Sequence, residues 1–128
     1  MKIKHFGGIE YVNNIEEFAN VLSQKYGANV NEFWITEDEK ENPCLAILIN
    51  KELANVTYFP DEESLGFQAA GSVDNSDMDE FVVFYTNTPD EEIEVSNEFI
   101  ITYDEAINIA KEFFDKHDMP ENVEWIEN

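Results

Sequence analysis

The feature that most constrains the fold is a series of short apolar runs between residues 32 and 95, joined by connections too short for parallel crossovers. The runs are rich in β-branched and aromatic residues, which favour strands. A parallel pair needs a crossover of a dozen or more residues, so neighbouring strands are expected to be antiparallel. Run 44–49 is apolar throughout and is expected at the centre of the sheet with both faces covered. The expected strands cover 2–6, 32–36, 44–49, 56–59, 65–70, 80–86 and 93–95.

A segment of helical periodicity precedes this series. Asn14 and Glu17 have the spacing of an N-cap and its partner, and apolar residues follow at helical intervals. Gly27 supplies a stop signal. The pattern predicts a helix over 15–26.

A second helical segment follows the strands. Thr102 and Glu105 form a T-x-x-E capping box at its start, Phe113 lies on its broad apolar face, and Pro120 ends it. The tail beyond it carries Trp125. A tail this short needs an anchor to stay ordered, so Trp125 is expected to pack on the core rather than to act as an interface residue.

These patterns predict an α+β fold: a mostly antiparallel sheet of about six strands with an N-terminal and a C-terminal helix packed on it. The chain has 128 residues, an ordinary size for one domain, so 1–128 is expected to form a single unit. Hydrophobic residues make up 43% of the sequence and aromatic residues 13%. Disordered acidic segments lack such aromatics, so a packed core is expected despite the charge.

The charge balance narrows the choice of partner. The chain has 29 acidic residues against seven lysines and no arginine, for a net charge of −22. This charge repels nucleic acid phosphates and anionic lipid headgroups, so neither nucleic acid nor a membrane is expected as a partner. A basic protein fits it. No apolar stretch has the length of a membrane span or the form of a signal peptide, which predicts a cytoplasmic protein.

The titratable residues show no pattern typical of a catalytic or metal site. The acidic stretch 74–80 lacks the alternating oxygens and the glycine of an EF-hand. His5, Cys44 and His117 are scattered, which argues against zinc. Cys44 is expected to be a buried small hydrophobe, and His117 to interact with the dipole at a helix C-terminus. With no nucleophile elbow or phosphate-binding glycine loop, we expect no enzyme activity, no metal and no cofactor.

The C-terminal third carries a recognisable sequence pattern. It comprises a strand at 91–96, I-T-Y-D-E-A at 101–106, phenylalanines at 113 and 114, and M-P-E-N-V-E-W at 119–125. It resembles immunity protein family 1 of bacterial polymorphic toxin systems. The strands at 56–59 and 65–71 are also similar, so the resemblance covers roughly 45–126. One departure is Val95-Ser96, where the family pattern has a proline after the acidic residue.

The resemblance implies an α+β protein that binds a cognate toxin and protects the producing cell. Toxins associated with such families are often deaminases that act on nucleic acid bases. A basic substrate face on such a toxin would steer a partner of net charge −22 toward it. We therefore expect a 1:1 complex that buries roughly 1,600 Å² and covers the substrate face of the toxin.

Two acidic loops and one tryptophan are the expected contacts. Trp34 lies beside the first loop, and the sequence leaves open whether it anchors a partner or packs in the sheet. Two other functions also stay open: an acidic nucleic-acid mimic that inhibits a DNA- or RNA-binding protein, and a small hydrolase. The candidate contact residues are Trp34, Glu37, Asp38, Glu39, Asp61, Glu62 and Glu63.

Overall fold

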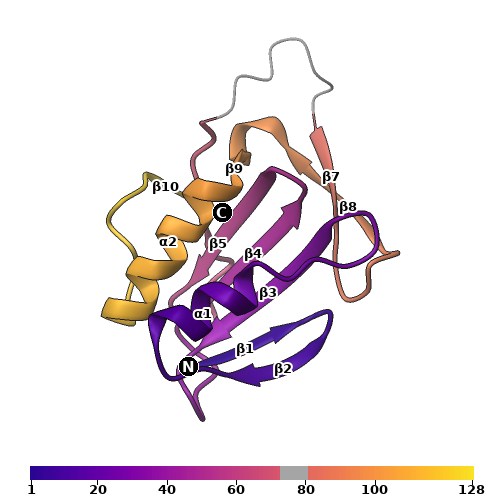
Figure 1. Cartoon of the computed structure of the whole chain (residues 1–128). Helices are drawn as coiled ribbons and strands as arrows, with labels where there is room; N and C mark the ends of the chain where they lie inside the picture. Colours follow the sequence, from indigo (N-terminus) through magenta and orange to yellow (C-terminus); the bar gives the residue numbers. More distant parts are fainter. Residues whose placement is uncertain (73–80) are drawn as a thin grey trace.

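The computed structural model describes residues 1–72 and 81–128 (Figure 1). The predicted α+β fold, with two helices and a mostly antiparallel sheet, is confirmed. The expected acidic loop at 74–79 and the start of the expected strand at 80 lie outside these residues. The elements are β1 (Lys2–His5), β2 (Gly8–Tyr11), α1 (Ile15–Leu22), β3 (Val30–Thr36), β4 (Cys44–Asn50), β5 (Leu53–Phe59), β6 (Phe67–Ala69), β7 (Phe81–Tyr85), β8 (Glu92–Ser96), the 3-10 turn η1 (Asn97–Phe99), β9 (Ile101–Thr102), α2 (Tyr103–Lys116) and β10 (Trp125–Glu127).

The main sheet has eight strands, in the order β10-β6-β5-β4-β3-β1-β2, with β9 also paired to β5. Its strand pairs are antiparallel. The strands β7 and β8 form a separate two-stranded hairpin. The expected sheet of about six strands differs from this one in two ways. The runs expected as strands at 80–86 and 93–95 contribute to the separate hairpin, and β2, β9 and β10, with only two to four residues each, were not predicted.

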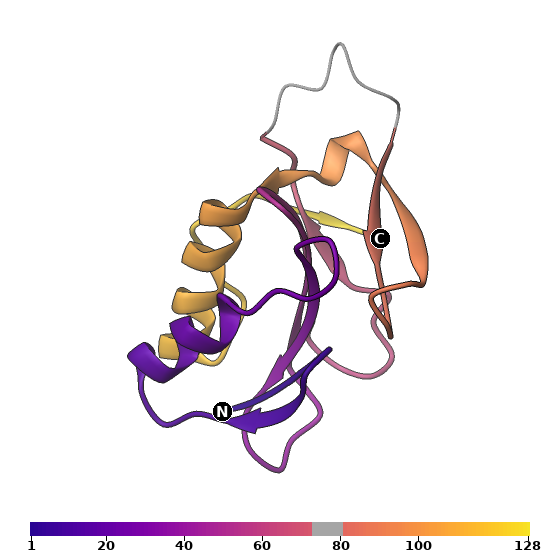
Figure 2. The same ribbon diagram turned by 45° about the vertical axis from the view of Figure 1, so that its right-hand side comes forward.

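The two helices lie on one face of the main sheet, and the β7–β8 hairpin lies on the other (Figure 2). Between the helices and the sheet is the larger hydrophobic core. Phe18 and Leu22 of α1, Phe113 of α2 and Ile47 of β4 are fully buried in it. Each such side chain stabilises the fold by about 1.5–3 kcal/mol relative to leaving it exposed.

The first helix is shorter than the predicted 15–26, because α1 ends at Leu22. Tyr26 forms two backbone hydrogen bonds with Val30, at 2.8 and 2.9 Å, which close a tight turn. The Asn31 side chain donates to the carbonyl oxygen of Gln24 at 2.7 Å. These tertiary bonds take the backbone groups that a longer helix would have used.

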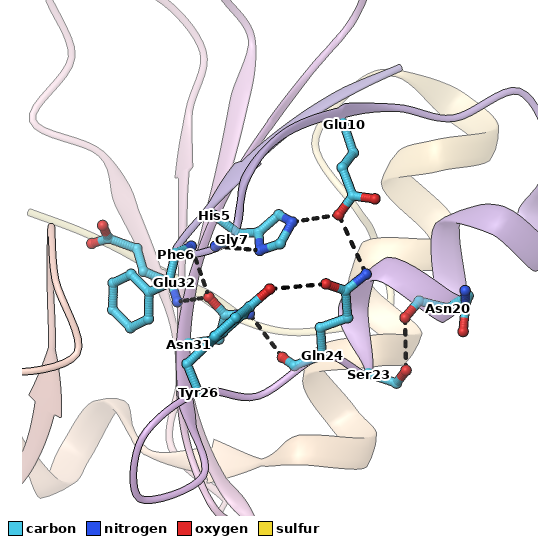
Figure 3. A network of polar contacts seen from close by, with 10 residues as sticks. All are labelled: His5, Phe6, Gly7, Glu10, Asn20, Ser23, Gln24, Tyr26, Asn31 and Glu32. Carbon is cyan, nitrogen blue, oxygen red and sulfur yellow. Dashed lines mark hydrogen bonds and ion pairs between the residues drawn. The ribbon is translucent and has the colours of Figure 1, made fainter.

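The first strand ends at His5, close to the expected end at Phe6. The chain then turns at Phe6-Gly7 and returns as β2, which was not predicted. The His5 ring lies beneath this hairpin, where its Nε2 donates to Glu10 at 2.5 Å and its Nδ1 accepts from the Gly7 amide at 3.1 Å (Figure 3). Tyr26 covers the turn so closely that a Cβ at Gly7 would lie 1.9 Å from its hydroxyl. A larger residue at Gly7 would therefore force the Tyr26 and His5 side chains to shift.

The second helix has the capping box that its sequence predicts. The Glu105 amide donates to the Thr102 hydroxyl at 3.2 Å, and the Thr102 amide donates to the Glu105 carboxylate at 3.3 Å. His117 takes the left-handed conformation at the C-cap, with φ 56°, and contacts Glu37. No helix in the described part of the chain is long and apolar enough to cross a membrane.

The tail after α2 returns along the edge of the sheet. Trp125 on β10 pairs with Ala69 of β6, and its ring lies 6.1 Å from that of Tyr58. Its indole Nε1 donates to the carbonyl oxygen of Pro120 at 2.7 Å. Trp125 is half-buried and packs against the core between sheet and helices.

Candidate functional site

The face of the main sheet opposite the helices, here called the open face, is only partly covered. Directly paired residues of antiparallel strands point to the same face, so one continuous row of side chains crosses it. The expectation that β4 has both faces covered holds fully on the helix side and only in part on the open face, where Ala46 and Leu48 are half-buried. The row runs Ile9, Lys4, Trp34, Ala46, Thr57, Gln68 and Ile126.

The β7–β8 hairpin covers the β3–β5 part of this face. Asn50 Nδ2 donates to the Val83 carbonyl oxygen at 2.8 Å and joins the hairpin to β4. A second, smaller hydrophobic core lies between them. Its buried members are Val82, Phe84, Val95 and Ile100, with Leu48, Leu53 and Phe99 packed against them.

A buried carboxylate also holds the hairpin. Glu32 on β3 is 6% exposed and accepts hydrogen bonds from the Thr86 hydroxyl at 2.5 Å and the Asn87 amide at 3.0 Å. Both donors are neutral. Within residues 1–72 and 81–128, no ion pair involves Glu32. Its charge is therefore buried without a cation.

Between the open face and β8 lies a cleft of 360 Å³. Asn55 Nδ2 donates to Gln68 Oε1 at 2.8 Å and to the Phe99 carbonyl oxygen at 3.2 Å, which fixes the amides of the floor. Apolar side chains and the Thr57 hydroxyl complete the floor, and two carboxylates, Glu32 and Glu94, also line the cleft. The lining residues are Glu32, Trp34, Ala46, Leu48, Asn55, Thr57, Phe59, Gln68, Ile93, Glu94, Val95, Ser96, Phe99 and Asn128.

A second hollow adjoins the cleft and shares Trp34 and Phe59 with it. The two rings are stacked, with centroids 6.1 Å apart and an angle of 24° between their planes. Trp34 is nevertheless 38% exposed. The structure thus brings three of the predicted contact residues together, because Asp61 and Glu62 line the second hollow with Trp34. Its other lining residues are Glu41, Asn42, Cys44 and Ser64.

The first acidic loop is largely engaged within the chain. Glu37 pairs with Lys40 at 2.5 Å and contacts His117, and these two partners hold the pKa of its carboxyl below the usual value. Asp38 lies 2.9 Å from the N-terminal amine. Glu39 is exposed in a left-handed turn with φ 62°, and Glu63 is exposed on the second loop.

Comparison with known proteins gives one informative match. No protein-family model matches the chain. The chain is 26% identical, over 125 residues, to a double-stranded DNA deaminase immunity protein of Burkholderia cenocepacia strain H111. The match covers 95% of each chain. This similarity supports an immunity-protein family of toxin systems, and immunity protein family 1 in particular stays a prediction.

Three residues that line the cleft, Glu32, Ile93 and Glu94, were not predicted from the sequence. Glu32 and Trp34 are two positions apart on one strand, so alternation alone places them on the same face. The contributions of Ile93 and Glu94 depend on where the hairpin docks. That position follows from contacts more than thirty residues apart in sequence, such as Asn50 to Val83.

Cys44, which lines the second hollow, is a poor nucleophile. Burial raises the pKa of the Cys44 thiol to about 11, so the thiolate is scarce at neutral pH. Tyr58 lies on the other face of the sheet, in the larger core, where burial and then the hydrogen bond to Asp118 raise its pKa to about 12. In the described ranges, no group of three or more His, Cys, Asp or Glu side chains could hold a metal ion. The arrangement is suited to binding through aromatic and carboxylate groups.

Proposed function

We propose that this chain is an immunity protein that binds and neutralises a deaminase toxin acting on DNA. The observation that carries the proposal is the similarity, over 95% of both chains, to a protein whose name joins immunity with a double-stranded DNA deaminase. The similarity extends through the sheet, the hairpin and both helices rather than a single motif.

The charge of the chain supports the same proposal. An enzyme that acts on DNA needs a basic surface for the phosphates. A protein with net charge −22 is steered toward such a surface and raises the rate of encounter. We propose that the chain inhibits by occupancy, without catalysis. It forms a 1:1 complex that buries roughly 1,600 Å² and covers the substrate face of the toxin.

The proposed contacts are the acidic loops and the exposed tryptophan. Trp34 is half-exposed at the centre of the open face, where interface tryptophans are effective anchors. The loop with Asp61 and Glu62 lies beside it. The loop of Glu37, Asp38 and Glu39 is proposed as the outer part of the same contact region, with Glu63 at its edge.

An acidic nucleic-acid mimic is a second candidate, favoured by the excess of 29 carboxylates over seven lysines. Such a mimic would also bind a basic surface through its carboxylates. It would differ from an immunity protein in which protein it binds. A mimic would bind many DNA-binding proteins through their basic surfaces. An immunity protein would bind its cognate toxin and reject other DNA-binding proteins. A wrong partner would fit its surface poorly and would leave buried polar groups without hydrogen bonds.

Co-expression tests the proposal. The toxin domain encoded by the neighbouring gene is induced in cells with and without this chain, and a catalytically inactive toxin serves as bait in a parallel purification. We expect survival only with the chain, and a 1:1 complex on the bait. Death of cells that contain abundant soluble chain would refute the proposal. Equal binding to unrelated DNA-binding proteins would favour the mimic.

A further inference from the structure

We propose that the cleft under the β7–β8 hairpin is a receptor for one basic side chain, an arginine or lysine carried on an exposed loop of the partner protein. The inference rests on the proposed function for the identity of the partner. The receptor itself is a property of this chain. It extends the contact region from the acidic loops to the open face of the sheet.

The charge of Glu32 has no cationic partner within the described chain. Its two hydrogen bonds come from neutral groups, Thr86 and Asn87, and each carboxylate oxygen accepts one of them. Each oxygen keeps a further acceptor position. A carboxylate that is 6% exposed without a cation is costly, and a charged partner that entered the cleft would offset that cost. The folded chain therefore holds an acceptor for a cation that it does not supply.

An aromatic surface lies beside Glu32. Trp34 is two positions from Glu32 on the same face of β3, and it lines the same cleft. Phe59 stacks against it. Tryptophan is the strongest aromatic partner for a cation, and a guanidinium can stack on the ring while it donates to a carboxylate.

The charge around the cleft is negative. Glu94 lies across the cleft on β8, and the hollow on the other side of Trp34 is lined by Glu41, Asp61 and Glu62. No lysine lines either hollow in the parts of the chain that the structure describes. Lys4 pairs with Trp34 from the β1 side but lies outside both linings.

The size of the cleft also fits one side chain. A volume of 360 Å³ is at the small end of ligand pockets, which suits a long side chain with its flanking backbone rather than a helix. Ile93, which is 40% exposed at the rim, and Leu48 on the floor provide apolar contact for the methylene groups of such a side chain. The cleft therefore combines a charged end, an aromatic wall and an apolar approach.

The decisive variant is Glu32→Gln, which removes the charge and keeps the size of the side chain; its one amide oxygen can still accept from the Asn87 amide, while the Thr86 hydroxyl must turn to accept from the amide nitrogen. Its control is Glu16→Gln on the exposed surface of α1, which changes the net charge equally. We expect Glu32→Gln to stay folded at the assay temperature and to weaken binding of the toxin domain at least about tenfold, and the control to change affinity less than twofold. A purely structural role for Glu32 would instead lower the melting temperature and leave affinity intact. Unchanged affinity would overturn the inference.

A second variant blocks the cleft. Ala46→Lys places a chain-borne ammonium beside Trp34, its direct cross-strand partner, and Asn108→Lys on α2 is the control with the same added charge. We expect the Ala46 variant to stay folded and to lose at least about tenfold in affinity, because its own cation occupies the receptor. Wild-type affinity in a folded Ala46→Lys variant would contradict the proposal.

A probe without the toxin separates this inference from the proposed function. The peptide acetyl-Gly-Arg-Gly-amide and its neutral citrulline counterpart are titrated into the labelled protein, with the indole N–H signal of Trp34 as the readout. We expect a saturable shift with the arginine peptide that is absent with citrulline and in Glu32→Gln. Equal responses would overturn the inference. If the wild-type chain fails to bind the toxin, the proposed function is wrong. The peptide titration still tests, independently of the toxin, whether the cleft binds a basic side chain.

Discussion

Replacement of Trp125 by alanine separates a structural role from an interface role for the tail. The indole packs on the core beside Tyr58 and donates to the Pro120 carbonyl oxygen at 2.7 Å. Truncation removes the ring that holds β10 against β6, and it removes the donor for that carbonyl. The tail should then detach before the rest of the chain unfolds.

The expected loss follows from the partial burial of the ring. A fully buried tryptophan replaced by alanine costs about 3–5 kcal/mol. Trp125 is half-buried, so the lost packing and the lost hydrogen bond together should lower the free energy of unfolding by roughly 2–3 kcal/mol. In a chain of this length, 1 kcal/mol corresponds to about 4 °C, which predicts a melting temperature lower by roughly 8–12 °C.

Urea unfolding and thermal melting measure this effect, with toxin affinity determined well below the melting temperature. Ile126→Ala is the matched control, because Ile126 is the next residue on β10, points to the open face and is 39% exposed. Its melting temperature should move by less than about 2 °C. If Trp125→Ala melted like the wild type but failed to bind the toxin, Trp125 would be an interface residue and the packing account would be wrong.

Further predictions concern titration, reactivity and charge. A hydrogen bond from the Ser72 hydroxyl, with those from Thr102, lowers the pKa of Glu105 below 4.5; its stabilisation is therefore complete above that pH and lost below it. The stability gap between wild type and Glu105→Gln in urea should shrink from about pH 6 to about pH 3, and a constant gap would contradict this. Cys44 should react with a thiol reagent only on unfolding, since burial raises its pKa to about 11, and rapid labelling of the native state at pH 8 would refute its burial. Added salt should slow association with the toxin steeply and change dissociation little; an insensitive association rate would exclude steering. Reversal of the charges at 61–63 should weaken binding more than reversal at 37–39, where Lys40 and the N-terminal amine already engage two carboxylates; no effect from both together would remove the loops from the interface.

Local sequence patterns predicted the elements whose conformation depends mainly on residues within the element. The capping box of Thr102 and Glu105 predicted the start of α2, and the apolar run of β4 predicted a central strand. The end of α1 was missed because Asn31 and Val30 bind the backbone of Gln24 and Tyr26. Those bonds depend on the position of β3, which periodicity within the helix does not contain.

The candidate site was partly accessible from sequence for the same reason. Trp34, Asp61 and Glu62 stand out as an exposed aromatic candidate and an acidic turn, and they meet at one hollow. The role of Glu32 could not be predicted, because its partners Thr86 and Asn87 lie 54 and 55 positions away. Only the docking of the hairpin turns an ordinary strand residue into a buried acceptor without a cation.

The most direct test is a titration of toxin activity on double-stranded DNA with the purified chain. The proposed partner, a deaminase toxin domain, is held at fixed concentration, and deaminated bases are counted as the chain is added. The account predicts that activity falls in proportion to added chain and vanishes near one chain per toxin. Full deamination in the presence of a tenfold excess of folded chain would contradict it.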